Sequence, residues 1–179
     1  MRTCHLLAAC AAVFISLSLH AQVNNFSVSQ EGKAFWQKVY DTNLEHDGLL
    51  NIIINNGQFV DVVDGDVITF RVVRAKLDFK KLGYSRGAIP IYAAGSDVSC
   101  FVTVQIKDGR YRVTADNIVL TENSTGGLMK EGTENPIETW AVRNGEITKA
   151  FSKVPSQLYD KFFSGMFLLE GKSYIDDEW

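Results

Sequence analysis

Residues 98–120 read VSCFVTVQIKDGRYRVTADNIVL, and they carry the clearest structural signal in the chain. Apolar and polar residues alternate on both sides of Asp108-Gly109, a dipeptide that favours the positive φ angles of a tight hairpin turn. A two-residue turn at this point fixes which residues of the two strands face each other. The pairs that would face a core are Ile106 with Tyr111, Val104 with Val113, and Val102 with Ala115. The sequence therefore predicts an antiparallel hairpin with one buried face.

The opposite face of this hairpin is polar and carries three cations. Its facing pairs are Lys107 with Arg110, Gln105 with Arg112, and Thr103 with Thr114. Three cations on one face would suit an anionic ligand, but a solvated surface beside acidic neighbours is the more common meaning of such a pattern.

Two further strands are predicted before the hairpin, over residues 58–63 and 66–76. Asp64-Gly65 separates them and favours a tight turn. The alternation slips at Val72-Val73, because apolar residues before and after this point fall on different faces. We therefore expect a bulge there.

Two more segments have strand character. Residues 34–40 alternate and predict a strand with both faces partly covered. Residues 88–92 predict a short strand, which Pro90 confines to a sheet edge because proline has no N–H to donate.

Residues 44–56 contain three consecutive isoleucines, which favour a strand, but their apolar positions repeat with the period of a helix. At about 3.6 residues per turn, one broad face collects His46, Leu49, Leu50, Ile52, Ile53 and Ile54. Asp41 or Thr42 is expected to cap the start, and Gly57 to take a left-handed conformation at the end. The sequence thus predicts an amphipathic helix.

A second amphipathic helix is predicted over residues 156–169, with Pro155 at its first position, where a missing N–H has no effect. Its apolar arc is rich in aromatic side chains. Such an arc usually packs on a sheet as core, although it would also line a ligand cavity. The candidate binding residues on this arc are Tyr159, Phe162, Phe163, Met166 and Phe167.

These elements predict an α+β fold in which a curved antiparallel sheet packs on the C-terminal helix. Residues 34–169 would form a single domain, preceded by a flexible segment over residues 22–33 and followed by an acidic tail over residues 170–179. Residues 121–139 make a long connection, and such loops are often functional or mobile.

Residues 1–21 are typical of a cleaved secretory signal peptide. Arg2 precedes an apolar run that is too short to span a membrane comfortably, and Ala21 is the small residue expected before the cleavage point. The alternative is lipidation at Cys10, but it would leave an apolar stretch on the mature chain. We expect an exported protein, periplasmic or secreted, that is not an integral membrane protein.

Composition narrows the chemistry further. The chain has 179 residues, with 18 Lys and Arg against 21 Asp and Glu, which argues against a nucleic-acid partner. After cleavage Cys100 would be the only cysteine, so no internal disulfide would form. His46 would be the only histidine, which excludes a zinc site of three or four His and Cys ligands. No metal and no cofactor are expected.

One hydrolase-like motif is present. Residues 83–87, GYSRG, fit the G-x-S-x-G pattern, which needs a strand that turns sharply into a helix and exposes the serine. Here a strand is predicted to follow, and His46 precedes Ser85 rather than following it. A glycine-rich turn is the better interpretation, and a small serine-dependent hydrolase using Ser85 is the alternative function.

Several segments in this order resemble a bacterial protein family. They are FWQKVY at residues 35–40, GYS at 83–85, PIY at 90–92, KDGRYRV at 107–113 and NIVL at 117–120. The resemblance is to DUF4468, a family of domains of unknown function with a TBP-like fold, common in small exported proteins of the Bacteroidetes. It covers most of residues 34–169 and implies the order β-α-β-β-β-β-α, with which the elements predicted above agree. It implies no activity and no site residues.

The sequence contains no catalytic cluster, so we expect a non-enzymatic binding or interaction module of the cell envelope. Two kinds of partner stay open. A curved sheet around an aromatic-rich helix would leave a cavity for a small apolar ligand, whereas the loop over residues 121–139 would contact an envelope protein.

Overall fold

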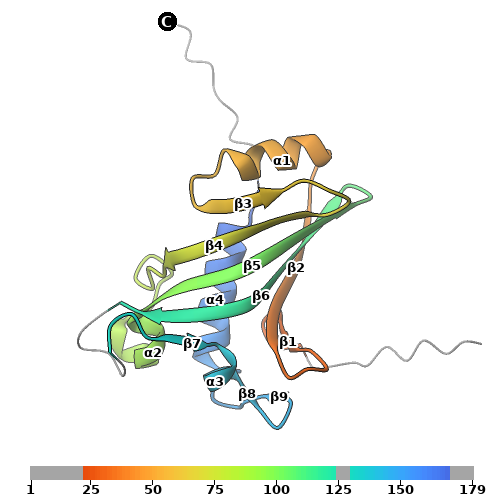
Figure 1. Ribbon diagram of the computed structural model, residues 1–179. Coiled ribbons are helices and arrows are strands. Elements are labelled where there is room, and N and C mark those ends of the chain that lie inside the picture. The colour runs from red at the N-terminus through yellow and green to blue at the C-terminus, as the bar shows by residue number, and fades with distance from the viewer. Residues whose placement is uncertain (1–21, 124–129, 170–179) are drawn as a thin grey trace, which may run out of the picture.

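A computed structural model of the protein describes residues 22–123 and 130–169. Within these residues a seven-stranded antiparallel sheet and a two-stranded ribbon accompany a long C-terminal helix, which lies against one face of the large sheet (Figure 1). The predicted α+β class, with its antiparallel sheet and C-terminal helix, is confirmed. The predicted signal peptide with Cys10, the acidic tail and residues 124–129 of the long connection lie outside the described residues.

The strands are β1 (Phe26–Val28), β2 (Ala34–Asp41), β3 (Phe59–Val63), β4 (Ile68–Lys76), β5 (Ser96–Lys107), β6 (Arg110–Glu122), β7 (Glu134–Pro136), β8 (Val142–Arg143) and β9 (Glu146–Ile147). The helices are α1 (His46–Ile54), α2 (Ile91–Ala94), α3 (Glu138–Ala141) and α4 (Val154–Met166), and η1 (Arg86–Ala88) is a 3-10 turn.

The large sheet has the strand order β1-β2-β6-β5-β4-β3, and β7 also pairs with β6. One edge of β6 therefore serves two strands: β2 pairs with residues 110–115 and β7 with residues 119–121. Asn117 lies between these two stretches with φ at +47°. β3 stands at the other end of the order, and among the described residues β4 is its one pairing partner.

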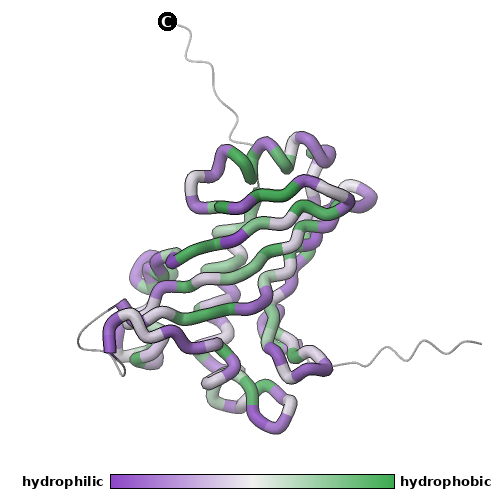
Figure 2. The backbone as a smooth tube through the Cα atoms, viewed as in Figure 1, coloured by the Kyte–Doolittle hydropathy of each residue, from purple (hydrophilic) through white to green (hydrophobic). Residues whose placement is uncertain are grey.

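The β5–β6 hairpin forms in the predicted register. Asp108 and Gly109 have φ of +51° and +71°, as a tight turn of this kind requires. Ile106 pairs with Tyr111, Val104 with Val113, and Val102 with Ala115. Hydrophobic and hydrophilic residues alternate along the central strands, as Figure 2 shows. The prediction of one buried face is confirmed, since both members of the Val104 and Val113 pair are fully buried.

The β3–β4 hairpin also forms. The register of β4 against its other neighbour, β5, shifts between Val72 and Ala75, where a bulge was predicted. Arg74 in this bulge has φ at +50°. The turn itself differs from the prediction, because neither Asp64 nor Gly65 takes a positive φ. Four residues rather than two separate the paired strands, and this longer connection does not require left-handed backbone.

Helix α1 is shorter than the predicted helix over residues 44–56, and its caps differ. Glu45 is the N-cap residue, whereas Asp41 belongs to β2. The helix ends in right-handed backbone at Asn55, and Gly57 does not have a positive φ. Leu49 and Ile53 are buried as predicted, but Ile54 is 57% exposed because the helix covers only the edge of the sheet.

Two further local predictions were wrong, and the long connection contains regular structure. Residues 88–92 were predicted to form a strand, but they contain the end of η1 and the start of α2, whose N-cap is Pro90. A strand, β1, lies in the segment predicted to be flexible, and it pairs with β2. The long connection contains β7 and α3, so it is only partly irregular.

Aromatic rings fill the layer between α4 and the sheet. Trp36 of β2 is fully buried, and its ring centroid lies 5.4 Å from that of Phe163 and 5.8 Å from that of Phe167. Phe26 of β1 lies 6.3 Å from Phe163 between ring centroids. These contacts place the aromatic core under the C-terminal half of α4.

Hydrogen bonds fix one side of α4 to β1 and β2. The Asp160 carboxylate accepts hydrogen bonds from Asn25 Nδ2 at 2.7 Å and from Trp36 Nε1 at 2.9 Å. One turn later, Lys38 Nζ donates to Ser164 Oγ at 2.8 Å. The helix is thus anchored along its β1–β2 side, and its other side faces the β3 and β4 end of the sheet.

Candidate functional site

A groove of about 610 Å³ lies between α4 and the β3–β4 end of the sheet, and we call it the α4 groove. Sites for single small molecules usually occupy roughly 300–1000 Å³. Its apolar lining consists of Val60, Val73, Ala75, Leu82, Phe162 and Met166. The polar lining and the glycines are Gly57, Gln58, Arg74, Lys76, Asp78, Lys81, Lys161 and Gly165.

Glycine opens the groove on both walls. A Cβ added at Gly165 of α4, or at Gly57 before β3, would meet no atom within 4 Å. Glycine inside a helix lowers stability by about 1 kcal/mol relative to alanine. Gly165 therefore exposes helix backbone to the groove at a cost to the stability of α4.

The sheet side of the groove exposes apolar surface to water. Val60 of β3 is 40% exposed and Val73 of β4 is 47% exposed. Both lie beside the bulge of β4, which interrupts the regular pairing with β5 between Val72 and Ala75. Apolar side chains gathered in a hollow of this size form a surface on which a ligand would bury them.

The structure divides the five predicted binding residues into two groups. Tyr159, Phe163 and Phe167 are fully buried. They pack in the core, where the rings of Phe163 and Phe167 stack at 5.8 Å. Phe162 and Met166 line the α4 groove, and Phe162 is 9% exposed there. A ligand-binding role stays a prediction for all five, and only the last two border the groove.

The charged wall of the groove was not predicted from the sequence. Arg74 and Lys76 come from the end of β4, Lys81 from the loop after it, and Lys161 from α4. No periodic pattern connects these positions along the chain. The predicted bulge at Val72-Val73 was the one signal near them, because bulges often redirect side chains at sites.

Ser85, the candidate nucleophile, lies in extended backbone with φ at −87° just before η1. Within the described residues, no histidine or carboxylate is recorded as hydrogen-bonded to its Oγ. The strand-to-helix turn that a nucleophile elbow needs is replaced here by a single 3-10 turn, followed by Ile89 in extended backbone. The local geometry therefore lends the hydrolase alternative no support.

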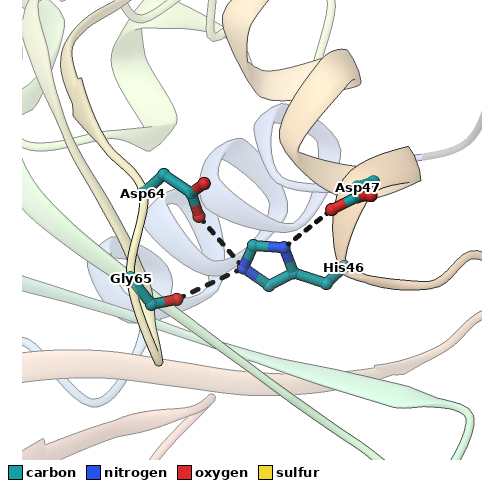
Figure 3. Close-up of polar contacts among 4 residues, drawn as sticks. All are labelled: His46, Asp47, Asp64 and Gly65. Carbon is teal, nitrogen blue, oxygen red and sulfur yellow. Dashed lines mark hydrogen bonds and ion pairs between the residues drawn. The ribbon is translucent and has the colours of Figure 1, made fainter.

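His46 joins the start of α1 to the β3–β4 turn (Figure 3). Its Nδ1 lies 3.3 Å from Asp47 Oδ1, and its Nε2 lies 3.3 Å from both Asp64 Oδ1 and the Gly65 carbonyl oxygen. All of these partners are acceptors, and a neutral imidazole has only one N–H to donate. The arrangement is therefore complete only when the ring is protonated.

We expect a raised pKa for His46, because the hydrogen bond to Asp47 and the charge of Asp64 favour the protonated ring. The stabilising contribution of these contacts should be fully present below the unfolded-state pKa of about 6.5 and lost as the pH rises through the folded-state pKa. NMR titration of the imidazole C–H signals measures this pKa. Asp47→Asn should lower it most, Asp64→Asn less, and Asp66→Asn hardly at all. A wild-type pKa at or below 6.5 would contradict the assignment.

Other reactive chemistry is sparse in the part of the chain that the structure describes. No three residues among its His, Cys, Asp and Glu are placed to hold a metal ion. Cys100 is 5% exposed, and burial raises the pKa of its thiol, with the charge of Asp116 adding to the effect. A thiol that stays protonated in an apolar site is a poor nucleophile, as its strand position predicted.

Among residues 22–123 and 130–169, no helix has both the length and the apolar character needed to cross a bilayer.

Comparisons with known proteins found likeness only among solved structures. No family model matches the chain, and no curated protein matches it either. A TBP-like protein from Parabacteroides distasonis has 13% identity and a TM-score of 0.43, over 77% of this chain and 89% of that one. A DUF4468 family protein from Bacteroides ovatus has 15% identity and a TM-score of 0.47, over 83% of this chain and 88% of that one. Because both TM-scores lie below 0.5, the fold assignment rests on the strand order and register of this chain itself.

Proposed function

We propose that this chain is an exported, non-enzymatic binding module of the bacterial cell envelope that holds a small apolar ligand in the α4 groove. The signal-peptide features of residues 1–21 support export. Ser85 lies in extended backbone before a single 3-10 turn, which is not the strand-to-helix turn of a nucleophile elbow.

The observation that carries the proposal is the apolar lining of the groove. Val60 and Val73 are exposed beside Phe162 and Met166, and the space over Gly165 is open. Burying apolar surface gains roughly 25 cal/mol for each Å² removed from water. A ligand that covers these side chains would remove their apolar surface from water, and the free energy gained would stabilise the complex.

Filling the groove from the helix side tests the proposal. We expect Gly165→Leu to weaken the binding of phenylnaphthylamine, a neutral apolar probe that fluoresces in apolar sites, by at least about tenfold. The physical reason is that the leucine side chain would occupy the open space over α4. Fluorescence titration of the purified protein gives the dissociation constant.

Gly165→Ala is the matched control, because its single methyl group meets no atom within 4 Å and leaves most of the groove open. Alanine and leucine both favour a helix over glycine, so neither variant should unfold α4. Thermal unfolding followed by circular dichroism verifies this. If the wild type does not bind the probe, or if Gly165→Leu binds it as tightly as the wild type, the groove is not a ligand site.

A further inference from the structure

The α4 groove concentrates positive charge in a chain that is acidic as a whole. Four cations and one carboxylate, Asp78, line it, whereas the full chain has 18 Lys and Arg against 21 Asp and Glu. A hollow lined by one sign of charge raises the local concentration of the opposite sign. The groove therefore combines an excess of positive charge with an apolar lining.

Within the described part of the chain, the cations of the groove are not neutralised by close, buried ion pairs, so they can attract an anionic group. Lys161 Nζ lies 4.8 Å from the centre of the Tyr84 ring and 3.5 Å from the Leu82 carbonyl oxygen, and neither partner is ionised. Lys81 Nζ lies 3.8 Å from Asp78 Oδ2, but the two side chains are 85% and 48% exposed, so water screens the pair.

The remaining two cations lie at the end of β4. Arg74 Nε is 3.9 Å from Asp97 Oδ2, a long contact for an ion pair. Lys76 is exposed, and no ion pair is recorded for it among the described residues. Together the four cations border the same hollow as Val60, Val73 and Phe162, so one ligand would meet both kinds of surface.

We propose that the ligand of the α4 groove is a free fatty acid, with its acyl chain along the apolar lining and its carboxylate at the ammonium groups of Lys76 and Lys81. This inference rests on the proposed function, which it deepens by naming the ligand class. The positive charge of the four cations complements the carboxylate, and the apolar lining of the groove complements the acyl chain.

The size and the chemistry of the groove favour one acyl chain with a compact head. A hollow of about 610 Å³ suits a single small molecule rather than a membrane lipid with two chains. Three of the four cations are lysines, whose ammonium groups are point charges on flexible stems. Such groups can pair with a compact carboxylate without the fixed bidentate geometry of an arginine.

The test compares ligands that differ only in the head group. Decanoate, decanol and decyltrimethylammonium should displace phenylnaphthylamine from the full-length purified protein in that order of strength. We expect decanoate to bind at least about tenfold more tightly than decanol at low ionic strength. In about 1 M NaCl, where the screening length falls to roughly 3 Å, the two should converge.

A second experiment removes the positive charges that the proposal assigns to the carboxylate. The double variant Lys76→Gln and Lys81→Gln should lose the preference for decanoate while it still binds decanol as the wild type does. The matched control is Lys33→Gln with Lys153→Gln, which removes the same charge from two exposed lysines outside the groove. We expect this control to keep the preference in full.

The outcomes separate this inference from the proposed function. If decanol or decyltrimethylammonium binds as tightly as decanoate at low salt, or if both double variants behave alike, the fatty-acid assignment fails while the groove remains an apolar site. If none of the three compounds displaces the probe and Gly165→Leu binds the probe normally, the proposed function itself fails. A decanoate preference lost only in the groove variant supports the assignment.

Discussion

Trp36→Ala should lower the free energy of unfolding by about 3–5 kcal/mol, the usual range for removing a buried aromatic side chain. Trp36 is fully buried between β2 and α4, with its ring against Phe163 and Phe167. The alanine would leave a cavity that the surrounding rings can fill only in part. Because small proteins are stable by only about 5–15 kcal/mol, this single change would remove a large share of the total.

Urea unfolding followed by circular dichroism measures this loss as a shift of the midpoint at constant slope. Trp140→Ala is the matched control. Trp140 is only partly buried, with one face stacked on Tyr92 at 4.6 Å between ring centroids, so its removal should be clearly less damaging. If the two variants lose equal stability, Trp36 does not have the central packing role assigned to it.

Asp160→Ala should lower the free energy of unfolding by about 2–3 kcal/mol, because hydrogen bonds to charged groups contribute roughly 1.5–3 kcal/mol each. The Asp160 carboxylate accepts from Asn25 Nδ2 at 2.7 Å and from Trp36 Nε1 at 2.9 Å. Its removal would leave the indole N–H of a fully buried tryptophan without its acceptor. Urea unfolding again gives the magnitude.

A double-mutant cycle isolates the bond between the two side chains. Trp36→Phe removes the N–H but keeps a ring, so the combined loss with Asp160→Ala should be smaller than the sum of the two single losses. Asp66→Ala serves as the control, because Asp66 is exposed in the β3–β4 turn and should change stability by less than about 0.5 kcal/mol. Strict additivity in the cycle would show that Asp160 does not act through Trp36.

The elements predicted well are those whose determinants are local. Asp108-Gly109 fixes the register of its hairpin, because the turn has few conformations and each strand residue follows from it. The slip of alternation at Val72-Val73 identified a bulge, because apolar residues can change face along one strand only where an extra residue interrupts the pairing. The helical period of residues 46–54 correctly overruled the β preference of three isoleucines.

The elements predicted wrongly are those whose state depends on distant partners. β1 is only three residues long, and it forms because β2 offers an edge on which it can pair. β7 likewise depends on the edge of β6 beyond Asn117. Pro90 suggested an edge strand, but proline is equally suited to the start of a helical turn, and no local signal separates the two.

The candidate site shows the same division. The apolar arc of α4 contains the five candidate binding residues, and the sequence alone does not distinguish core residues from groove residues among them. Only the tertiary structure separates Phe162 and Met166, which border the groove, from Tyr159, Phe163 and Phe167, which are fully buried in the core. The apolar arc of the helix is wider than the part that the core buries, so Phe162 and Met166 border the groove.

The sequence by itself determined the fold class, the central hairpin and the amphipathic character of both long helices, because these follow from turn chemistry and from periods of two and about 3.6 residues. Only the tertiary structure decided that Arg74, Lys76, Lys81 and Lys161 surround one apolar hollow. The first three come from the end of β4 and the loop that follows it, whereas Lys161 comes from α4, which lies far from them along the chain. Their proximity is set by where α4 crosses the sheet, which the packing of Trp36 against Phe163 and Phe167 fixes.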